Sequence, residues 1–167
     1  MSLAGMTIRP ATLDDLEMVL ELERSVVEAP HWSEKEYRTG LEGAVGKGLR
    51  RCFLVAEHAG EMVGFAVGKV IGLGENAQAE LESLAVAGVT RRSGVGRALC
   101  EAVFIWCRRE GATEVELEVR SANTAAIALY AKLGFELVSK RTGYYRDPVD
   151  DAMLMRRELG AGQFSGS

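Results

Sequence analysis

The segment from Arg91 to Arg97 reads Arg-Arg-Ser-Gly-Val-Gly-Arg, and its residue types favour the binding of an anion. A predicted strand at 78–86 precedes it, and a helical pattern of apolar residues follows it. Because Gly94 and Gly96 lack side chains, backbone N–H groups there can approach a ligand closely. A helix start adds unpaired N–H donors and a partial positive charge. The segment therefore predicts a site for phosphate or pyrophosphate.

Three known patterns compete for this segment. A Walker loop needs Gly-Lys-Ser/Thr, which the segment lacks. A dinucleotide fingerprint needs a third glycine three residues after Gly96, where this chain has Leu99. The remaining pattern, Arg/Gln-x-x-Gly-x-Gly/Ala, is matched by the residues from Arg91 to Gly96. This match resembles the pyrophosphate loop with which GNAT acetyltransferases bind coenzyme A.

Further segments extend the resemblance over almost the whole chain, from Ile8 to Leu159. Within the family, the sequence is most similar to the ribosomal-protein-alanine N-acetyltransferases (RimI-type). The similar segments are Pro30–Glu34, Leu84–Val86, Leu117–Asn123, Ala126–Tyr130, Leu133–Phe135 and Gly143–Tyr145. Two departures fall where the family binds its acceptor: His31 is inserted, and Gly143 replaces an asparagine. They leave the identity of the acceptor open.

Glu118 is the residue that the resemblance implies as catalytic base. It ends an alternating segment in which Glu114, Glu116 and Glu118 share one face, so a merely solvated strand face is the alternative interpretation. Glu80 is the rival base, because another branch of the superfamily carries its glutamate on the preceding strand. Glu82, acting through water, is a third possibility.

Tyr130 is the residue that the resemblance implies as catalytic acid, although its place on an apolar helical stripe would also suit a core aromatic. Asn123 can cap the helix and can also bind the pantetheine arm of the coenzyme. The complete set of expected coenzyme-binding residues is Leu84, Ala85, Val86, Arg91, Arg92, Ser93, Gly94, Val95, Gly96, Arg97 and Asn123.

Four aromatic residues are expected to line the acceptor groove. They are Trp32, Tyr37, Tyr144 and Tyr145. Packing in the core is the alternative role for each of them.

The pattern of apolar residues predicts the elements that position these groups. We expect the order β-α-α-β-β-β-α-β-α-β-β, which folds as one mixed α/β (α+β) sheet, mostly antiparallel, of about seven strands and about four helices. Expected strands lie at 6–9, 51–58, 62–70, 78–86, 113–119, 136–142 and 152–158. Helices are expected after the capping signals Thr12/Asp15 and Ser33/Glu36 (the second over 34–45), from Val95 to Gly111, and from Asn123 to Gly134.

Composition limits the remaining possibilities. The 167 residues suit one domain, expected over 4–160, with residues 1–3 and 161–167 as tails or a cloning remnant. A net charge of −4 disfavours nucleic-acid binding. No apolar run approaches the ~20 residues of a membrane span. Three cysteines without metal-ligand spacing favour free thiols, no metal site and the cytoplasm.

The sequence therefore predicts an acetyl-CoA-dependent enzyme that acetylates the N-terminal α-amino group of a protein, and the resemblance suggests a ribosomal protein as the acceptor. A GNAT enzyme acting on a small amine or a lysine side chain is the alternative within enzymes. A module that binds acyl-coenzyme A without turnover is the alternative outside them. Either a monomer or a homodimer is compatible with the sequence.

Overall fold

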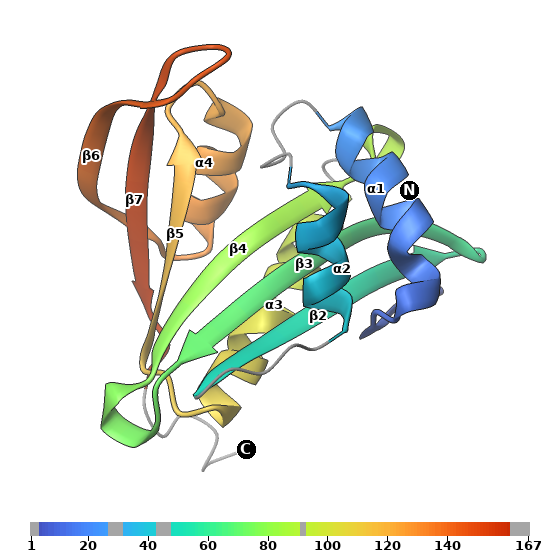
Figure 1. Ribbon diagram of the computed structural model, residues 1–167, viewed down its shortest axis with the longest axis horizontal. Coiled ribbons are helices and arrows are strands. Elements are labelled where there is room, and N and C mark those ends of the chain that lie inside the picture. The colour runs from blue at the N-terminus through green and yellow to red at the C-terminus, as the bar shows by residue number, and fades with distance from the viewer. Residues whose placement is uncertain (1–3, 27–31, 43–47, 91–92, 161–167) are drawn as a thin grey trace.

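One mixed sheet of seven strands organises the computed structural model, which describes residues 4–26, 32–42, 48–90 and 93–160 (Figure 1). Across the sheet the strands follow the order β1-β2-β3-β4-β5-β7-β6. Their bounds are β1 Met6–Pro10, β2 Leu49–His58, β3 Glu61–Ile71, β4 Gln78–Val86, β5 Glu114–Arg120, β6 Glu136–Tyr145 and β7 Asp150–Glu158. Neighbouring strands are antiparallel except β4 and β5, which are parallel. The predicted fold class is confirmed.

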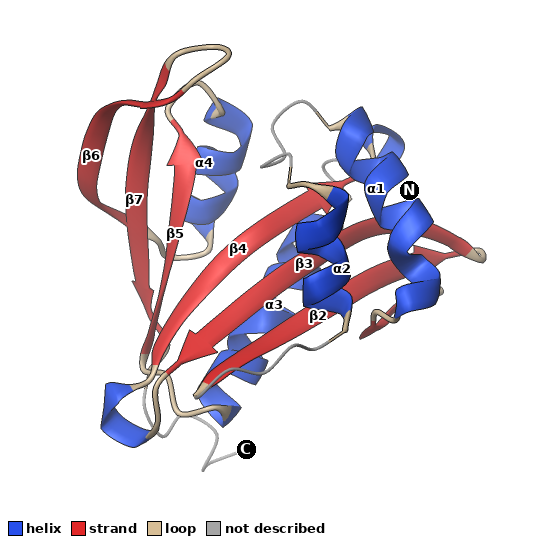
Figure 2. Ribbon diagram, in the orientation of Figure 1, coloured by secondary structure: helices blue, strands red, loops and turns tan. Residues whose placement is uncertain are grey.

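Helices cover both faces of the sheet, as Figure 2 shows. One apolar cluster, which includes Phe65 and Val67, joins the sheet to the first two helices, and a second cluster, which includes Leu99 and Leu117, joins it to the other two. The helices are α1 Leu16–Ser25, α2 Glu34–Leu41, α3 Val95–Arg109 and α4 Thr124–Lys132. Three short 3-10 turns are η1 Leu13–Asp15, η2 Gly74–Asn76 and η3 Gly88–Thr90.

The capping signals seen in the sequence place the starts of the helices. The Ser33 backbone N–H donates to Glu36 Oε2 at 2.6 Å, and the Glu36 N–H donates to Ser33 Oγ at 3.2 Å. This reciprocal pair is a capping box, and it fixes the start of α2. The helix ends at Leu41, and the remainder of its predicted extent, 43–45, lies outside the described residues.

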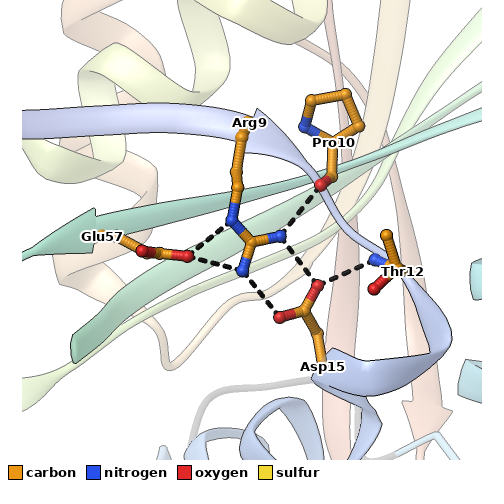
Figure 3. A network of polar contacts seen from close by, with 5 residues as sticks. All are labelled: Arg9, Pro10, Thr12, Asp15 and Glu57. Carbon is orange, nitrogen blue, oxygen red and sulfur yellow. Dashed lines mark hydrogen bonds and ion pairs between the residues drawn. The ribbon is translucent and has the colours of Figure 1, made fainter. Parts of the chain in front are cut away.

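A polar network around Arg9 ties β1 to the start of α1 and to β2 (Figure 3). The Arg9 guanidinium donates to both Asp15 oxygens, at 2.7 and 2.9 Å, and it also pairs with Glu57. Asp15 Oδ2 accepts a further hydrogen bond from the Thr12 backbone N–H at 2.7 Å. The Arg9 guanidinium holds the pKa of the Asp15 carboxyl below its ordinary value.

The feature that creates the site is the short pairing between β4 and β5. Only Ala79 with Val115 and Glu80 with Glu116 are in register. Farther along, β4 carries a bulge at Glu82, since the register with β3 shifts there. A bulge bends its strand and increases the local twist. The two strands therefore meet near one end and separate toward the other, as Figure 1 shows.

Candidate active site

A groove of about 850 Å³ opens where β4 and β5 separate. Its walls come from β4, β5, the start of α3 and the length of α4, with Val26 at the end of α1 and Tyr145 at the end of β6. Residues that are far apart in the sequence meet in this one space. Among the predicted site residues, those that line it are Leu84, Val86, Gly94, Gly96, Arg97, Glu118, Asn123, Tyr130 and Tyr145, and the alternative base Glu82 lines it as well.

The glycine segment forms the start of α3, as expected. Gly94 is the N-cap residue, and its φ of 91° lies in the left-handed region, which favours glycine. A Cβ on Gly96 would lie 3.3 Å from Leu129 and 3.5 Å from Val86, so a small residue here keeps the backbone open to the groove. The unpaired N–H groups of this helix start favour an anion.

The other residues of this segment have different surroundings. Ser93 donates from its hydroxyl to the Thr90 carbonyl, and Val95 is buried in the core. Arg97 lines the groove while it pairs with Glu101 at 3.1 Å. Arg91 and Arg92 lie outside the described residues.

The strand β4 supplies backbone groups to the groove. Leu84 and Val86 line it, whereas the Ala85 side chain is buried on the opposite face, in the cluster under α1 and α2. Because the register pairs no residue of β4 beyond Glu80 with β5, this stretch keeps an edge that an extended ligand can join like a strand.

Glu118 reaches the groove from β5, opposite the buried side chains of Leu117 and Val119. Its side chain is 31% exposed, and Arg141 Nη1 lies 3.9 Å from Oε1. By contrast, Glu82 is 10% exposed and bonded to Arg51 Nε at 2.8 Å. Its second oxygen lies 3.6 Å from Lys69 Nζ. Glu118 is therefore less constrained than Glu82 as a proton acceptor.

Glu80, the other rival, lies at the closed end of the β4–β5 pairing. It pairs with Glu116 in the register, and its carboxylate lies 3.2 Å from Lys69 Nζ. It is not among the residues that line the groove. Its position separates it from Glu118 and Tyr130.

Asn123 and Tyr130 enter the groove from α4. Asn123 Oδ1 accepts from the Ala126 N–H at 3.1 Å, which confirms the predicted helix cap and leaves the amide NH₂ for a ligand. Tyr130 is nearly buried, and its ring packs edge-on against Phe135. Burial raises the pKa of the Tyr130 hydroxyl well above its ordinary value, so the hydroxyl keeps its proton at neutral pH and can donate a hydrogen bond into the groove.

The sequence was also compared with known families and proteins. The model of the acetyltransferase (GNAT) family matches residues 16–135, which span α1 to the end of α4. The chain belongs to the GNAT acetyltransferase family.

Individual relatives narrow the assignment of this GNAT chain. The ribosomal protein bS18-alanine N-acetyltransferase of Escherichia coli (strain K12) is 35% identical over 151 residues, which cover 89% of this chain and 95% of the relative. An N-alpha-acetyltransferase of Sulfurisphaera tokodaii is 33% identical over 163 residues, covering 91% of this chain and 92% of the relative. This GNAT chain is an acetyl-CoA-dependent N-acetyltransferase.

Solved structures agree with this assignment. The crystal structure of the Escherichia coli enzyme superposes with a TM-score of 0.75 at 31% identity, covering 93% of this chain and 94% of that one. The structure of Ard1 from Thermoplasma volcanium gives a TM-score of 0.78 at 31% identity, covering 92% and 97%.

The acceptor side of this GNAT enzyme departs from the sequence-based expectation. Tyr37 is 0% exposed and packs edge-on against Phe65, so its ring fills the cluster under α1 and α2 and does not line the groove. Trp32 packs against Tyr37, with ring centroids 5.1 Å apart, at the edge of the same cluster. Both rings take part in the apolar contacts that hold α2 on the sheet. Tyr145 lines the groove and Tyr144 stands exposed beside it.

Two cations that line the GNAT groove were not predicted. Arg120 follows Glu118 by two residues on the same face of β5, so strand alternation could have indicated it. Lys132 projects from the last turn of α4, and no sequence signal marks it.

Other candidate chemistry finds little support in the described residues of this GNAT enzyme. In the parts of the chain that the structure describes, no three His, Cys, Asp or Glu side chains are placed to hold a metal ion. Burial raises the pKa of Cys52, Cys100 and Cys107 each to about 12, so these thiols are poor nucleophiles. No helix of the described residues is long and apolar enough to cross a membrane.

Proposed function

We propose that this protein transfers the acetyl group of acetyl-CoA to the N-terminal α-amino group of a protein, with Glu118 and Tyr130 as the catalytic pair. The main support is the groove itself, which brings the glycine start of α3, the open edge of β4, Glu118 and Tyr130 to one place. The names of the relatives describe N-terminal acetylation in a bacterium and an archaeon. A ribosomal protein is the proposed acceptor, since the bacterial relative acts on bS18.

The reaction depends more on the placement of the amine than on activation of the thioester, because a thioester is already reactive. Holding the amine beside the thioester can lower the barrier by roughly 7–11 kcal/mol in ideal cases. The amine nitrogen attacks the acetyl carbonyl carbon, a C–N bond forms, and the C–S bond breaks with its electron pair going to sulfur. Glu118 accepts the proton of the amine directly or through water, and Tyr130 donates a proton to the departing thiolate.

The coenzyme is held by the residues on the α3 and α4 side of the groove. We assign its pyrophosphate to the backbone at Ser93–Gly96, with Arg91, Arg92 and Arg97 as counter-charges. The pantetheine arm is assigned to the edge of Leu84–Val86 and to the amide of Asn123.

The pKa of an α-amino group, which is lower than that of lysine, favours an N-terminus as the acceptor. A protein α-amino group has a pKa of about 8, so around a tenth is free base at pH 7, whereas lysine, near 10.4, is almost fully protonated. Glu118, which is partly exposed and lines the groove, is placed to accept the one proton that such an amine must lose. A modest base suffices for an N-terminus.

The first experiment is an acetyl-CoA assay read by mass spectrometry. Peptides with free N-termini that begin with Ala, Ser, Met or Gly are paired with N-blocked versions that contain lysine. We expect product only on the free N-termini, fastest for a peptide from the start of bS18. Product on the blocked lysine peptides would refute the N-terminal assignment, and coenzyme binding without any product would favour a non-catalytic module.

A further inference from the structure

Two arginines and two tyrosines stack in a column on the β5 and β6 side of the groove. The Arg120 guanidinium lies 4.3 Å from the centroid of the Tyr145 ring. Tyr145 packs edge-on against Tyr144 with centroids 5.2 Å apart, and the Arg141 guanidinium lies 5.3 Å from the Tyr144 ring. We name these four residues the Arg–Tyr column. Its Arg141 end lies beside Glu118.

Arg120 also anchors the turn between β6 and β7. Its Nη1 donates to the Pro148 carbonyl at 3.0 Å, and its Nη2 is 3.4 Å from the Arg146 carbonyl. One planar guanidinium thus engages two backbone carbonyls and one ring. A lysine ammonium is a point charge and cannot reproduce that planar, forked geometry.

The turn has little else to hold its tip. Val149 is 74% exposed and Tyr144 is 49% exposed, so few apolar contacts support this part of the hairpin. Asp150 fixes the start of β7, because its carboxylate accepts from Ser121 Oγ at 2.7 Å and from the Ala122 N–H at 3.1 Å. These bonds lie at the base of the turn. Segments with few buried contacts open most readily.

The column and the coenzyme elements lie on different faces of the sheet. Leu117 and Val119 point into the core shared with α3 and α4, so Glu118 and Arg120 point to the other face by strand alternation. The glycine start of α3 packs on the α3 and α4 side, where Gly96 adjoins Leu129. An acceptor that meets the coenzyme at Glu118 therefore approaches from the face that bears the column.

We propose that Arg120 is a positioning residue for the acceptor: it holds Tyr145 and the β6–β7 turn against the groove, and so governs acceptor binding without taking part in the chemical step. This inference rests on the proposed function for its identification of the acceptor side. The second arginine, Arg141, steadies Tyr144 at the other end of the column.

The first test is the acceptor kinetics of Arg120→Gln and Arg120→Lys. We expect the KM for the acceptor peptide to rise about tenfold in both, with kcat and the KM for acetyl-CoA changed less than about threefold. The matched control is Arg156→Gln, because Arg156 pairs with Glu116 at the closed end of the β4–β5 pairing. A fall in kcat at constant acceptor KM would overturn the proposal, as would full rescue by lysine.

A double-mutant cycle with Tyr145→Ala separates an indirect role from direct contact. If Arg120 acts through Tyr145, the double variant raises the acceptor KM no further than the larger single variant. Additive increases would mean that Arg120 does not act through Tyr145, which contradicts the proposed positioning of that ring.

A measurement that needs no acceptor distinguishes failure of this proposal from failure of the proposed function. Hydrogen exchange of residues 143–150 is compared between the wild type and Arg120→Gln. We expect exchange there to accelerate about tenfold while the rest of the sheet and the thermal midpoint stay unchanged. Unchanged exchange at 143–150 overturns the positioning role whatever the acceptor is. Faster exchange in a protein that acetylates no N-terminus would retain it and reject the N-terminal assignment alone.

Discussion

The two sides of the groove present different kinds of groups to a ligand. On the side that we assign to the coenzyme, most of the proposed contacts come from the backbone of β4 and of the start of α3, which the buried side chains of Val95 and Leu99 support, and Arg97 and Asn123 add side chains. On the acceptor side, they are side chains, among them Glu118 and Tyr145, on strands next to an exposed turn.

This difference leads us to expect that substitutions on the two sides will have different effects. A backbone site needs small residues at fixed positions, since a Cβ at Gly96 would already lie 3.3 Å from Leu129 and a larger side chain has no room. A side-chain site can change residue by residue without loss of the fold. We therefore expect substitutions on the coenzyme side to impair any acceptor equally, and those on the acceptor side to be selective.

The largest expected effect tests the chemistry at the boundary between the two sides. Glu118→Gln removes the proposed proton acceptor while keeping the shape of the side chain. We expect kcat to fall about a hundredfold or more, with the KM for acetyl-CoA unchanged, because general base catalysis commonly contributes that much. Initial rates measured with a free N-terminal peptide provide the check.

The matched control for this substitution is Glu116→Gln. Glu116 lies two residues earlier on the same strand face and pairs with Arg156 at 3.5 Å. Its loss should change kcat by less than about threefold. Equal losses in the two variants would show that the charge of the strand face matters, and not Glu118 as a base.

The next largest effect tests the coenzyme side. Gly96→Val places a branched side chain against Leu129 and Val86, and so blocks the approach of the coenzyme to the backbone. We expect the Kd for acetyl-CoA, measured by calorimetry, to rise at least about tenfold, whatever acceptor is present. Gly88→Ala is the control, since a Cβ there meets nothing within 4 Å. Unchanged coenzyme affinity in Gly96→Val would place the coenzyme elsewhere.

Some features of the fold could be predicted from local sequence signals, and others could not. Strand alternation, the Ser33/Glu36 capping box and the glycines of α3 are local signals, and the structure confirms the elements that they predict. The splay of β4 from β5 has no local signal, because it results from a bulge and a parallel register of two residue pairs.

The aromatic residues of the acceptor side show where sequence reading failed. Tyr37 and Tyr145 are both polar aromatics that follow charged or glycine-rich segments, yet one is buried under α2 and the other lines the groove. Which of the two happens depends on long-range packing, here the contact of Tyr37 with Phe65. The partners of Arg120, the Pro148 carbonyl and the Tyr145 ring, could likewise be found only from the structure.

A smaller effect tests the scaffold at the start of α1, away from the groove. Asp15 bonds Arg9 at the start of α1, and its folded-state pKa is lowered, chiefly by that hydrogen bond. Its contribution to stability is therefore present above the unfolded-state pKa of about 3.9 and is lost as the pH falls through the folded-state value. Asp15→Asn should cost about 2 kcal/mol near pH 7 by urea unfolding, and it should converge with the wild type in acid. The adjacent, exposed Asp14→Asn is the control, and an equal loss in both would contradict the role of the Arg9 pair.

The smallest expected effect decides whether Tyr37 belongs to the core or to the acceptor site. Its hydroxyl is buried near the Ser83 hydroxyl without a well-formed hydrogen bond among the described residues, and burial raises its pKa. Tyr37→Phe removes a desolvated polar group that has at most this weak contact, so the free energy of unfolding should stay within about 1 kcal/mol of the wild type or increase. The acceptor KM should not change, whereas Tyr145→Phe, at the groove, can alter it. A selective rise of the acceptor KM in Tyr37→Phe would show that this ring contacts the acceptor. The acceptor site would then extend beneath α2.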